Sequence, residues 1–255
     1  MNPAPQRIVC LSAESADWLW RIGAWEKVAG VTAYFTPPPG AGPKPRVSGF
    51  SSANMEQIVR LNPDLVITYS DVQAALAATL VQQGLTVLAT NQRTLAETET
   101  TLVLLARIVN REIMAEKVLA EFRRRLASVP HPARRPRVYF EEWNNPLVAG
   151  IGWVGELVER AGGEDVFSGL RSGRGVSQRV VTPGQVVQAD PEIIFASWCG
   201  KPLDAPAMAA RPGWEKISAV RNQQIHELPG EDILQPGFRL VQGFERMKQI
   251  IQSVS

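Results

Sequence analysis

A sequence repeat constrains the fold of this chain more than any other feature. The segment EQIVRLNPDLVITYS at 56–70 matches GQVVQADPEIIFASW at 184–198, at a constant offset of 128 residues. Pro63 aligns with Pro191, and in both copies a helical pattern ends before the proline and a strand-like run follows it. A duplicated helix–strand unit of this kind predicts two similar lobes within the 255 residues of the chain.

The elements expected around the repeat follow the order that is typical of α/β proteins. In the first half, RIVCLS, DLVITY and LTVLAT read as short strands with helical patterns between them. RVYFEEW opens a second series of the same kind, and WVGELVERAGGEDVF follows as helix, glycine and short apolar tail. Alternating strands and helices predict mostly parallel sheets covered by helices in both lobes.

A long helical pattern separates the two series. Its apolar positions recur at three- and four-residue steps and are Leu102, Leu105, Val109, Ile113 and, after a shift, Val118, Phe122 and Leu126. Because no Gly or Pro interrupts the pattern, the sequence predicts one continuous helix that resists a large hinge rotation. The expected domains are an N-terminal lobe over 1–94, this connecting helix over 95–129, and a C-terminal lobe over 130–255, with a ligand cleft between the lobes.

Composition excludes several classes of function. Lys and Arg number 27 against 25 Asp and Glu, so the formal net charge of +2 gives no support for a nucleic-acid partner. No run of 18 apolar residues occurs, and we expect no membrane insertion. Cys10 and Cys199 lie far apart and predict two buried free thiols rather than a disulfide framework. With His131 and His226 as the only histidines, we expect no metal site.

Aromatic residues gather just after the expected strands. In open α/β sheets ligands bind outside the carboxyl ends of the strands, and rigid aromatic side chains suit a wide, partly apolar ligand. The residues expected to bind the ligand are Ser12, Tyr34, Phe50, Tyr69, Glu142, Trp143, Trp153, Arg179, Trp198 and Asp232. Within this set, Glu142 either accepts hydrogen bonds from the ligand or pairs with Arg179.

An enzyme is the less favoured alternative. Glu141 and Glu142 are adjacent carboxylates, but neighbours on a strand point to opposite faces and cannot flank one bond. The run GIGWVG fits a dinucleotide-binding loop only in spacing, because Trp153 would crowd a pyrophosphate. We therefore expect no catalytic residues and no catalytic cofactor, and an enzyme of chelatase-like two-lobed architecture is kept only as the alternative.

Several segments together resemble the helical-backbone substrate-binding proteins of ABC importers. They are RIVCLSAESADWLWRIGAWEKVAGVT, NMEQIVRLNPDLVIT, GLTVLAT, WVGELVERAGGEDVF, PEIIF and RPGWEKISAVRNQQIHEL, and with the long helix they cover nearly the whole chain. Within that family the chain looks most like the cobalamin (vitamin B12)-binding members, whose relatives bind haem and iron siderophores. The resemblance implies a monomer that binds cobalamin or a related corrinoid and delivers it to an ABC transporter permease without catalysis.

Other ligands of the same family stay open. Arg171, Arg174 and Arg179 could face the negative charge of an iron siderophore. Tyr34 and Tyr69 could reach the iron of haem, whereas neither histidine is well placed for it.

The resemblance also implies one transporter-docking glutamate in each lobe. The matching positions are Glu56 in NMEQI and Glu215 in PGWEKI, each early in a helix, where stabilisation of the helix dipole explains a surface acid equally well. Members of the family are exported, yet MNPAPQRIVCLS leads almost directly into a strand and shows no signal peptide. We expect a periplasmic protein whose export signal has been removed; the alternative is a cytoplasmic corrinoid carrier or sensor without a transporter.

Overall fold

The chain forms two compact units. The computed structural model describes residues 4–130 and 134–254. The first unit runs to Arg123 and includes Pro236–Phe238, and the second comprises Arg124–Gln235 and the chain from Arg239 onward. None of the described helices combines the length and apolar character that crossing a bilayer requires.

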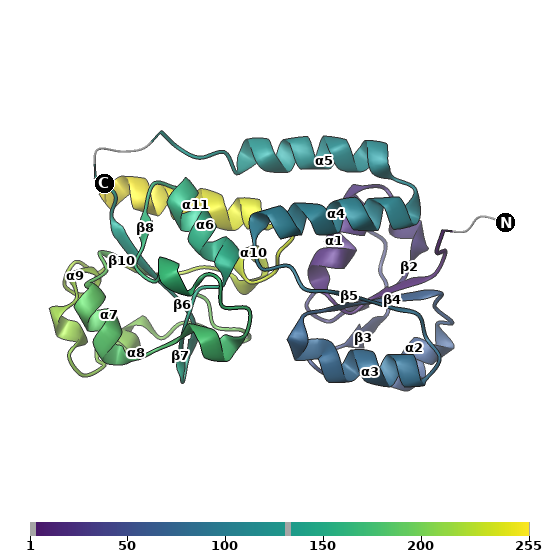
Figure 1. Cartoon of the computed structure of the whole chain (residues 1–255), viewed down its shortest axis with the longest axis horizontal. Helices are drawn as coiled ribbons and strands as arrows, with labels where there is room; N and C mark the ends of the chain where they lie inside the picture. Colours follow the sequence, from purple (N-terminus) through teal and green to yellow (C-terminus); the bar gives the residue numbers. More distant parts are fainter. Residues whose placement is uncertain (1–3, 131–133, 255) are drawn as a thin grey trace. The chain divides into compact units, whose positions relative to one another are not determined.

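Five parallel strands form the sheet of the first unit, in the order β3-β2-β1-β4-β5 (Figure 1). They are β1 (Ile8–Cys10), β2 (Val28–Thr32), β3 (Arg46–Ser48), β4 (Leu65–Tyr69) and β5 (Val87–Thr90). The three residues of β1 are all buried, as expected for a central strand that helices cover on both faces. The parallel sheet predicted for this lobe is confirmed.

Helices cover both faces of that sheet. They are α1 (Ala13–Arg21), α2 (Met55–Arg60), α3 (Ala74–Gln82), α4 (Leu95–Val109) and α5 (Glu112–Arg125), of which the last two residues belong to the second unit. In Figure 1, α2 and α3 lie below the sheet and α1 and α4 lie above it. Ile58 of α2 and Leu80 of α3 pack in one buried cluster with Val9 of β1, Leu11 just after it, and Val66 of β4. Alternate residues of each strand thus supply the core on one face.

The single helix expected over 95–129 is wrong. α4 ends at Val109, Asn110 adopts the left-handed backbone conformation (φ 58°, ψ 53°), and α5 begins only at Glu112. The backbone N–H of Arg111 donates to the carbonyl of Ala106 at 2.8 Å and closes the end of α4. Asparagine tolerates the left-handed region, so the helix ends without any Gly or Pro.

After this break the chain reverses. The guanidinium of Arg123, near the end of α5, pairs with Glu99, in the first turns of α4, at 2.5 Å, and Figure 1 shows α5 running back along α4. The two helices form an antiparallel hairpin. The rigidity expected from a continuous connecting helix therefore has no basis in the structure.

The sheet of the second unit contains both parallel and antiparallel strands. Its order is β11-β10-β6-β7-β9, and β8 also pairs with β6. The strands are β6 (Arg137–Asn144), β7 (Leu147–Ala149), β8 (Glu164–Asp165), β9 (Val180–Val181), β10 (Ile193–Ala196) and β11 (Ile225–Glu227). Strands β11, β10, β6 and β8 pair in parallel, whereas β7 runs antiparallel to both β6 and β9. The antiparallel pairings were not foreseen from the sequence.

Helices also lie on both faces of this second sheet. They are α6 (Gly152–Arg160), α7 (Pro183–Ala189), α8 (Ala205–Ala209), α9 (Ser218–Arg221), α10 (Gly230–Ile233) and α11 (Leu240–Val254). A buried cluster joins Tyr139 and Ile194 of the strands to Val186 of α7, Met208 of α8 and Trp214. Figure 1 places α6 and α11 on the face away from α7, α8 and α9.

The predicted repeat is present in the structure. α2 and β4 of the first unit correspond to α7 and β10 of the second. Each helix is followed by a residue of positive φ, Asn62 (47°) or Asp190 (41°), and then by a proline. The strand order β2-β1-β4-β5 recurs as β8-β6-β10-β11, so the prediction of two similar lobes is confirmed.

Candidate functional site

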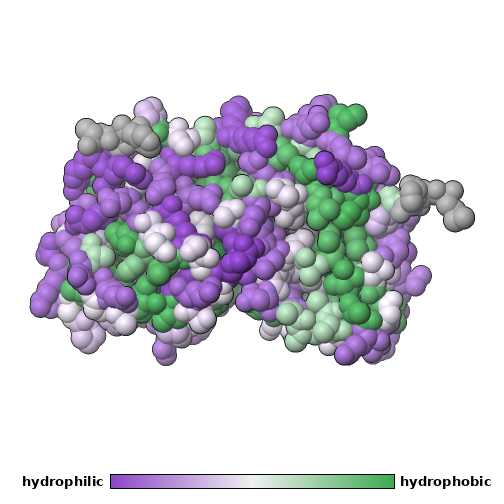
Figure 2. Space-filling view, in the orientation of Figure 1, coloured by the Kyte–Doolittle hydropathy of each residue, from purple (hydrophilic) through white to green (hydrophobic). Residues whose placement is uncertain are grey.

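An exposed aromatic pair marks the carboxyl edge of the first sheet. Tyr34 follows β2 and Phe50 follows β3; their side chains are 45% and 48% exposed, and their rings meet edge to face at 6.2 Å. A turn closed by the Gly49 N–H and the Ser52 carbonyl presents Phe50. Figure 2 shows hydrophobic residues reaching the surface of the first unit over a broad band. The structure thus brings two of the predicted ligand residues together on an accessible surface.

Tyr69 lies at the same edge with its hydroxyl already engaged. The hydroxyl accepts from Nη1 of Arg93 at 3.3 Å and donates to the carbonyl of Gln92 at 3.4 Å. Arg93 also pairs with Asp71 at 2.6 Å, and its guanidinium carbon lies 5.7 Å from the Tyr69 ring centroid. A ligand at this edge would contact the half-buried ring of Tyr69 more readily than its hydroxyl.

Ser12 is buried, contrary to expectation. It precedes α1, and its hydroxyl donates to Oγ of Ser15 at 2.8 Å. The hydroxyl is therefore occupied inside the unit, because the turn into α1 folds the side chain back on the helix. The assignment of Ser12 as a ligand contact stays a prediction.

Glu14, two residues further along α1, is a buried acid that sequence reasoning did not select. Burial raises its pKa from 4.5 to about 7, and its Oε1 has no hydrogen-bond partner. A Cβ placed on Gly237 would lie 3.0 Å from Cβ of Glu14, so the backbone of Pro236–Phe238 packs directly on this residue. An acid in the first turn of a helix normally indicates a surface position, so nothing in the local sequence signals that Glu14 is buried.

In the second unit, Glu142 pairs with Arg179, which is one of the two alternatives left open by the sequence. Nη1 and Nη2 of Arg179 both donate to the carboxylate, Nη2 at 3.2 Å, and Nη1 also donates to the carbonyl of Ala149 at 2.6 Å. Arg179 is buried. The ion pair is fixed at the carboxyl end of the second sheet. Arg179 therefore offers no accessible charge, and the carboxylate of Glu142 is already paired.

Arg171 is neutralised in a similar way. Its Nε lies 2.9 Å from Asp165 and its Nη2 lies 2.8 Å from Glu159. These carboxylates raise the pKa of Arg171, and the Arg171 side chain lowers the pKa of Glu159 by hydrogen bonding. Two of the three arginines considered for an anionic ligand are therefore held by acids of the same unit.

Glu141, at the carboxyl end of the second sheet, accepts four hydrogen bonds from side chains of the same unit. It is 0% exposed, and Arg211 donates to both of its oxygens, at 2.6 and 2.9 Å. Trp198 Nε1 and the Tyr139 hydroxyl donate to it at 3.1 and 3.2 Å. Burial, together with the charge of Glu141, raises the pKa of Tyr139 well above its ordinary value. Glu141 and Glu142 have separate partners, as expected for neighbours on a strand.

Trp143 is the accessible aromatic residue of the second edge among the candidates. Its indole is half-buried, donates to the carbonyl of Asn145 at 2.9 Å, and lies under the ammonium of Lys201 at 4.6 Å from the ring centroid. Trp198 is mostly buried in the core cluster, where its ring contributes to packing.

Trp153 and Asp232 are both buried in the second unit, and their assignment as ligand contacts stays a prediction. The indole of Trp153 is 1% exposed and donates to the carbonyl of Ile233 at 2.9 Å, so it packs inside the second unit. Asp232 is buried and pairs with Arg239 at 2.7 Å. The sequence placed both residues after strands or at a helix start but could not show which way their side chains turn.

Cys10, Cys199 and His226 lie among the residues that the structure describes. Cys10 and Cys199 are both free. Burial raises the pKa of Cys10 to about 12, whereas Cys199 is exposed and not buried as expected. Within residues 4–130 and 134–254, no three His, Cys, Asp or Glu side chains gather closely enough to hold a metal ion. His131 lies outside the described residues, and burial lowers the pKa of His226.

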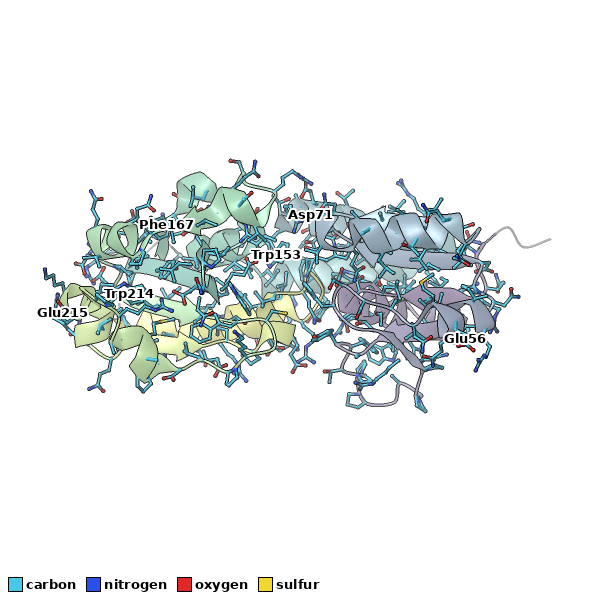
Figure 3. All side chains as sticks on the ribbon, turned by 90° about the horizontal axis from the view of Figure 1, so that it is seen from below. Glu56, Asp71, Trp153, Phe167, Trp214 and Glu215 are labelled. Carbon is cyan, nitrogen blue, oxygen red and sulfur yellow. The ribbon has the colours of Figure 1, made fainter. Side chains whose placement is uncertain are left out.

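Both candidate docking glutamates lie on the surface of their units (Figure 3). Glu56 occupies the first turn of α2, with its side chain 81% exposed and paired to Arg60 at 2.5 Å. Glu215 is exposed in the short 3₁₀ turn Trp214–Lys216. Their exposure meets the first requirement of a contact with a partner protein.

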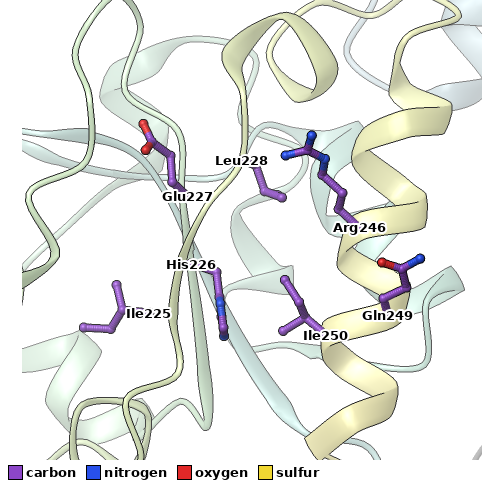
Figure 4. A pocket seen from close by; sticks show the side chains of 7 residues that line it. All are labelled: Ile225, His226, Glu227, Leu228, Arg246, Gln249 and Ile250. Atoms are coloured by element: carbon purple, nitrogen blue, oxygen red, sulfur yellow. The ribbon is translucent and has the colours of Figure 1, made fainter.

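A separate hollow of about 410 Å³ lies in the second unit between β11 and α11 (Figure 4). His226 on the strand and Arg246 and Gln249 on the helix are among its lining residues. It shares no residue with the strand-end candidates, so it is not part of the candidate ligand site.

The chain has clear relatives among known proteins. Residues 8–231 match the family described as "Periplasmic binding protein". A cobalamin-binding protein of Halobacterium salinarum is 27% identical over 265 residues, which cover 97% of this chain and 69% of that protein. The vitamin B12-binding protein BtuF of Vibrio cholerae shares the fold (TM-score 0.73, 22% identity, 98% of both chains). So does the haem-binding protein RhuT of Roseiflexus sp. RS-1 (TM-score 0.77, 19% identity, 98% of both chains).

Proposed function

Because the chain belongs to the periplasmic binding protein family, we propose that it binds cobalamin or a related corrinoid and delivers it to an ABC importer without catalysis. The relative from Halobacterium salinarum, described as cobalamin-binding, supports this ligand because the match extends over 97% of the chain. Family membership also supports a periplasmic location, with a cytoplasmic carrier or sensor as the alternative.

The observation that carries the proposal is the character of the accessible strand-end surfaces. In the first unit, Tyr34 and Phe50 form an exposed aromatic pair, and in the second unit the indole of Trp143 is accessible. Cobalamin is a large ligand with flat faces and uncharged amide arms, for which aromatic surface with a few polar groups is well suited. Arg171 and Arg179, two of the three arginines considered for an anionic chelate, are held in ion pairs.

Haem is the second candidate ligand. Tyr34 is exposed and could approach an iron, as tyrosine does in some haem proteins. Tyr69 is less suited to that role because its hydroxyl already bonds to Arg93 and Gln92. An iron siderophore is disfavoured by the same neutralised arginines that favour a corrinoid.

A calorimetric titration with three ligands tests the proposal. Cyanocobalamin, ferric haem and a ferric hydroxamate siderophore are titrated separately into the purified chain at micromolar concentration. We expect saturable heat with one cyanocobalamin per chain and a weaker signal, or none, with the other two. No heat with cyanocobalamin at these concentrations would overturn the proposed ligand, and tighter binding of haem would establish the second candidate.

We further propose that Glu56 and Glu215 contact the importer. The test is uptake of labelled cyanocobalamin by cells whose own binding protein has been replaced by this chain. Glu56→Gln is expected to lower uptake at unchanged affinity for the ligand. Glu112→Gln is the matched control, since Glu112 is also an exposed acid in the first turn of a helix. Equal uptake by the two variants would show that Glu56 serves only its own helix.

A further inference from the structure

A buried amide joins three segments at the carboxyl edge of the first sheet. Gln73 ends the short turn Asp71–Gln73 that follows β4, and it is 5% exposed. Its Nε2 donates to the carbonyl of Leu11 at 3.0 Å and to the carbonyl of Phe50 at 2.8 Å. Its Oε1 accepts from the backbone N–H of Tyr69 at 2.9 Å. One side chain thus bonds to backbone that follows β1, follows β3 and ends β4.

The local backbone directs Gln73 toward these partners. Ser70 has a φ of 60°, and its N–H donates to the carbonyl of Thr90 at 2.7 Å. The Ser70 hydroxyl accepts from the N–H of Val72 at 3.3 Å, and the Ser70 carbonyl accepts from the N–H of Gln73 at 3.2 Å. The turn is therefore fixed by its own hydrogen bonds. Its conformation directs the side chain of Gln73 toward the backbone of Leu11, Phe50 and Tyr69.

Only an amide meets all three requirements of this position. Two carbonyl oxygens need donors and one N–H needs an acceptor, and the glutamine amide supplies two donors and an acceptor. An ionised glutamate has no donor and would place a negative charge against two carbonyl oxygens. A methionine fills similar space and offers neither, which would leave three backbone groups of the edge unpaired.

We infer that Gln73 is a positioning residue of the ligand site. It holds the segments that carry Phe50 and Tyr69 against the end of β1 before a ligand arrives, so binding need not order them. The effect on binding rests on the proposed function, whereas the positioning of the three segments does not.

The first experiment needs no ligand. Amide hydrogen exchange is measured for Gln73→Met and for the wild-type chain. Exchange at the Tyr69 amide is expected to rise in the variant, while the Val66 amide, which donates to the carbonyl of Thr86, is expected to stay protected. Gln82→Met is the control, because Gln82 is exposed at the end of α3. An unchanged Tyr69 amide in a folded variant would overturn the inference.

The second experiment measures binding. We expect Gln73→Met to weaken binding of cyanocobalamin about tenfold or more, and Gln82→Met to leave it unchanged. Equal affinity of Gln73→Met and the wild-type chain would overturn the role of Gln73 in the ligand site.

A pH profile separates positioning from general loss of structure. Gln73→Glu retains the size of the side chain, and its carboxyl regains one O–H donor when protonated. Its affinity for cyanocobalamin is expected to rise as the pH falls, relative to the wild-type chain at each pH. A constant ratio across the pH range would contradict the inference. If the wild-type chain binds no cyanocobalamin, the proposed ligand fails, and the exchange experiment alone still decides whether Gln73 positions the edge.

Discussion

Each unit buries a glutamate near the carboxyl end of its sheet, and the two glutamates are held in different ways. Glu14 of the first unit is 4% exposed, its Oε1 is unpaired, and burial raises its pKa to about 7. Glu141 of the second unit is fully buried and receives donors from Arg211, Trp198 and Tyr139.

Glu14 and Glu141 represent two ways in which a fold accommodates a buried acid. Glu141 has a cation and two neutral donors, so its charge is matched inside the protein. The charged neighbour that affects Glu14 is Asp17, whose negative charge further raises the pKa of Glu14, while Arg21 pairs with Asp17 at 2.9 Å. A buried acid without its own cation is accommodated by keeping its proton. The pKa of the Glu14 carboxyl in the first unit is therefore raised to about 7.

Removal of the cation from the second edge is expected to have the largest effect. Arg211→Met leaves Glu141 as a buried charge without its partner, and we expect a loss of about 3–5 kcal/mol in the free energy of unfolding. Urea unfolding measures this change. Lys216→Met, at an exposed position nearby in sequence, is the control and should shift stability by about 0.5 kcal/mol or less. A loss below about 1 kcal/mol for Arg211→Met would show that Glu141 does not depend on this cation.

Replacement of Glu14, the buried acid of the first unit, is expected to change the free energy of unfolding by an amount that depends on pH. The folded chain keeps the Glu14 proton that the unfolded chain releases between pH 4.5 and about 7. Stability from this group is therefore complete below pH 4.5 and is lost as the pH rises to about 7, by about 3 kcal/mol in total. Glu14→Gln carries a permanently neutral amide and is expected to be the more stable protein above pH 7.

Urea unfolding of Glu14→Gln and the wild-type chain at acidic and at mildly alkaline pH checks this prediction. The stability difference should be small at acidic pH and should favour the variant at alkaline pH. Glu112→Gln, an exposed acid, serves as the control. The same difference at both pH values would mean that Glu14 titrates normally, and the contrast between the two edges would disappear.

Loss of a single neutral donor to Glu141 is expected to have a smaller effect. Trp198→Phe removes the indole N–H that lies 3.1 Å from the carboxylate, while Arg211 and Tyr139 remain. We expect a loss of about 1.5–3 kcal/mol, the range for hydrogen bonds to charged groups. Thermal unfolding provides the measurement. A loss as large as that of Arg211→Met would place the stabilisation of Glu141 in the indole and not in the ion pair.

The smallest effect on stability is expected at the exposed aromatic pair of the first edge. Tyr34→Ala should change the free energy of unfolding by about 0.5 kcal/mol or less, because Tyr34 is 45% exposed at the surface of its unit. The same variant should weaken cyanocobalamin binding about tenfold, since aromatic surface is lost from the site. Val81→Ala, also an exposed apolar residue of the first unit, should leave binding unchanged. Equal binding by both variants would remove Tyr34 from the site.

The sequence predicted the architecture better than the directions of single side chains. The repeat and the order of strands and helices follow from hydrophobic periodicity and from Asn62-Pro63 and Asp190-Pro191, which end helices locally. The break at Asn110 does not follow from the pattern, because no Gly or Pro is present and the apolar spacing continues from Val109 to Ile113.

The candidate site could be predicted only in part. Three of the aromatic candidates are accessible at strand ends, as expected: Tyr34, Phe50 and Trp143. Trp153 is instead buried, and its indole donates to the carbonyl of Ile233. Gln73 and Arg211 were not selected, because their roles depend on partners 62 and 70 residues away in the chain. Composition and local spacing carry no information about such partners.

The central claim, that this chain binds a corrinoid, is tested most directly by the absorbance spectrum of the protein purified from a host that makes both corrinoids and haem. We predict that the purified chain carries the corrinoid absorbance bands at close to one ligand per chain, and that a matched preparation of Tyr34→Ala carries less. A haem spectrum, or colourless protein from cells whose extract contains corrinoid, would contradict the account.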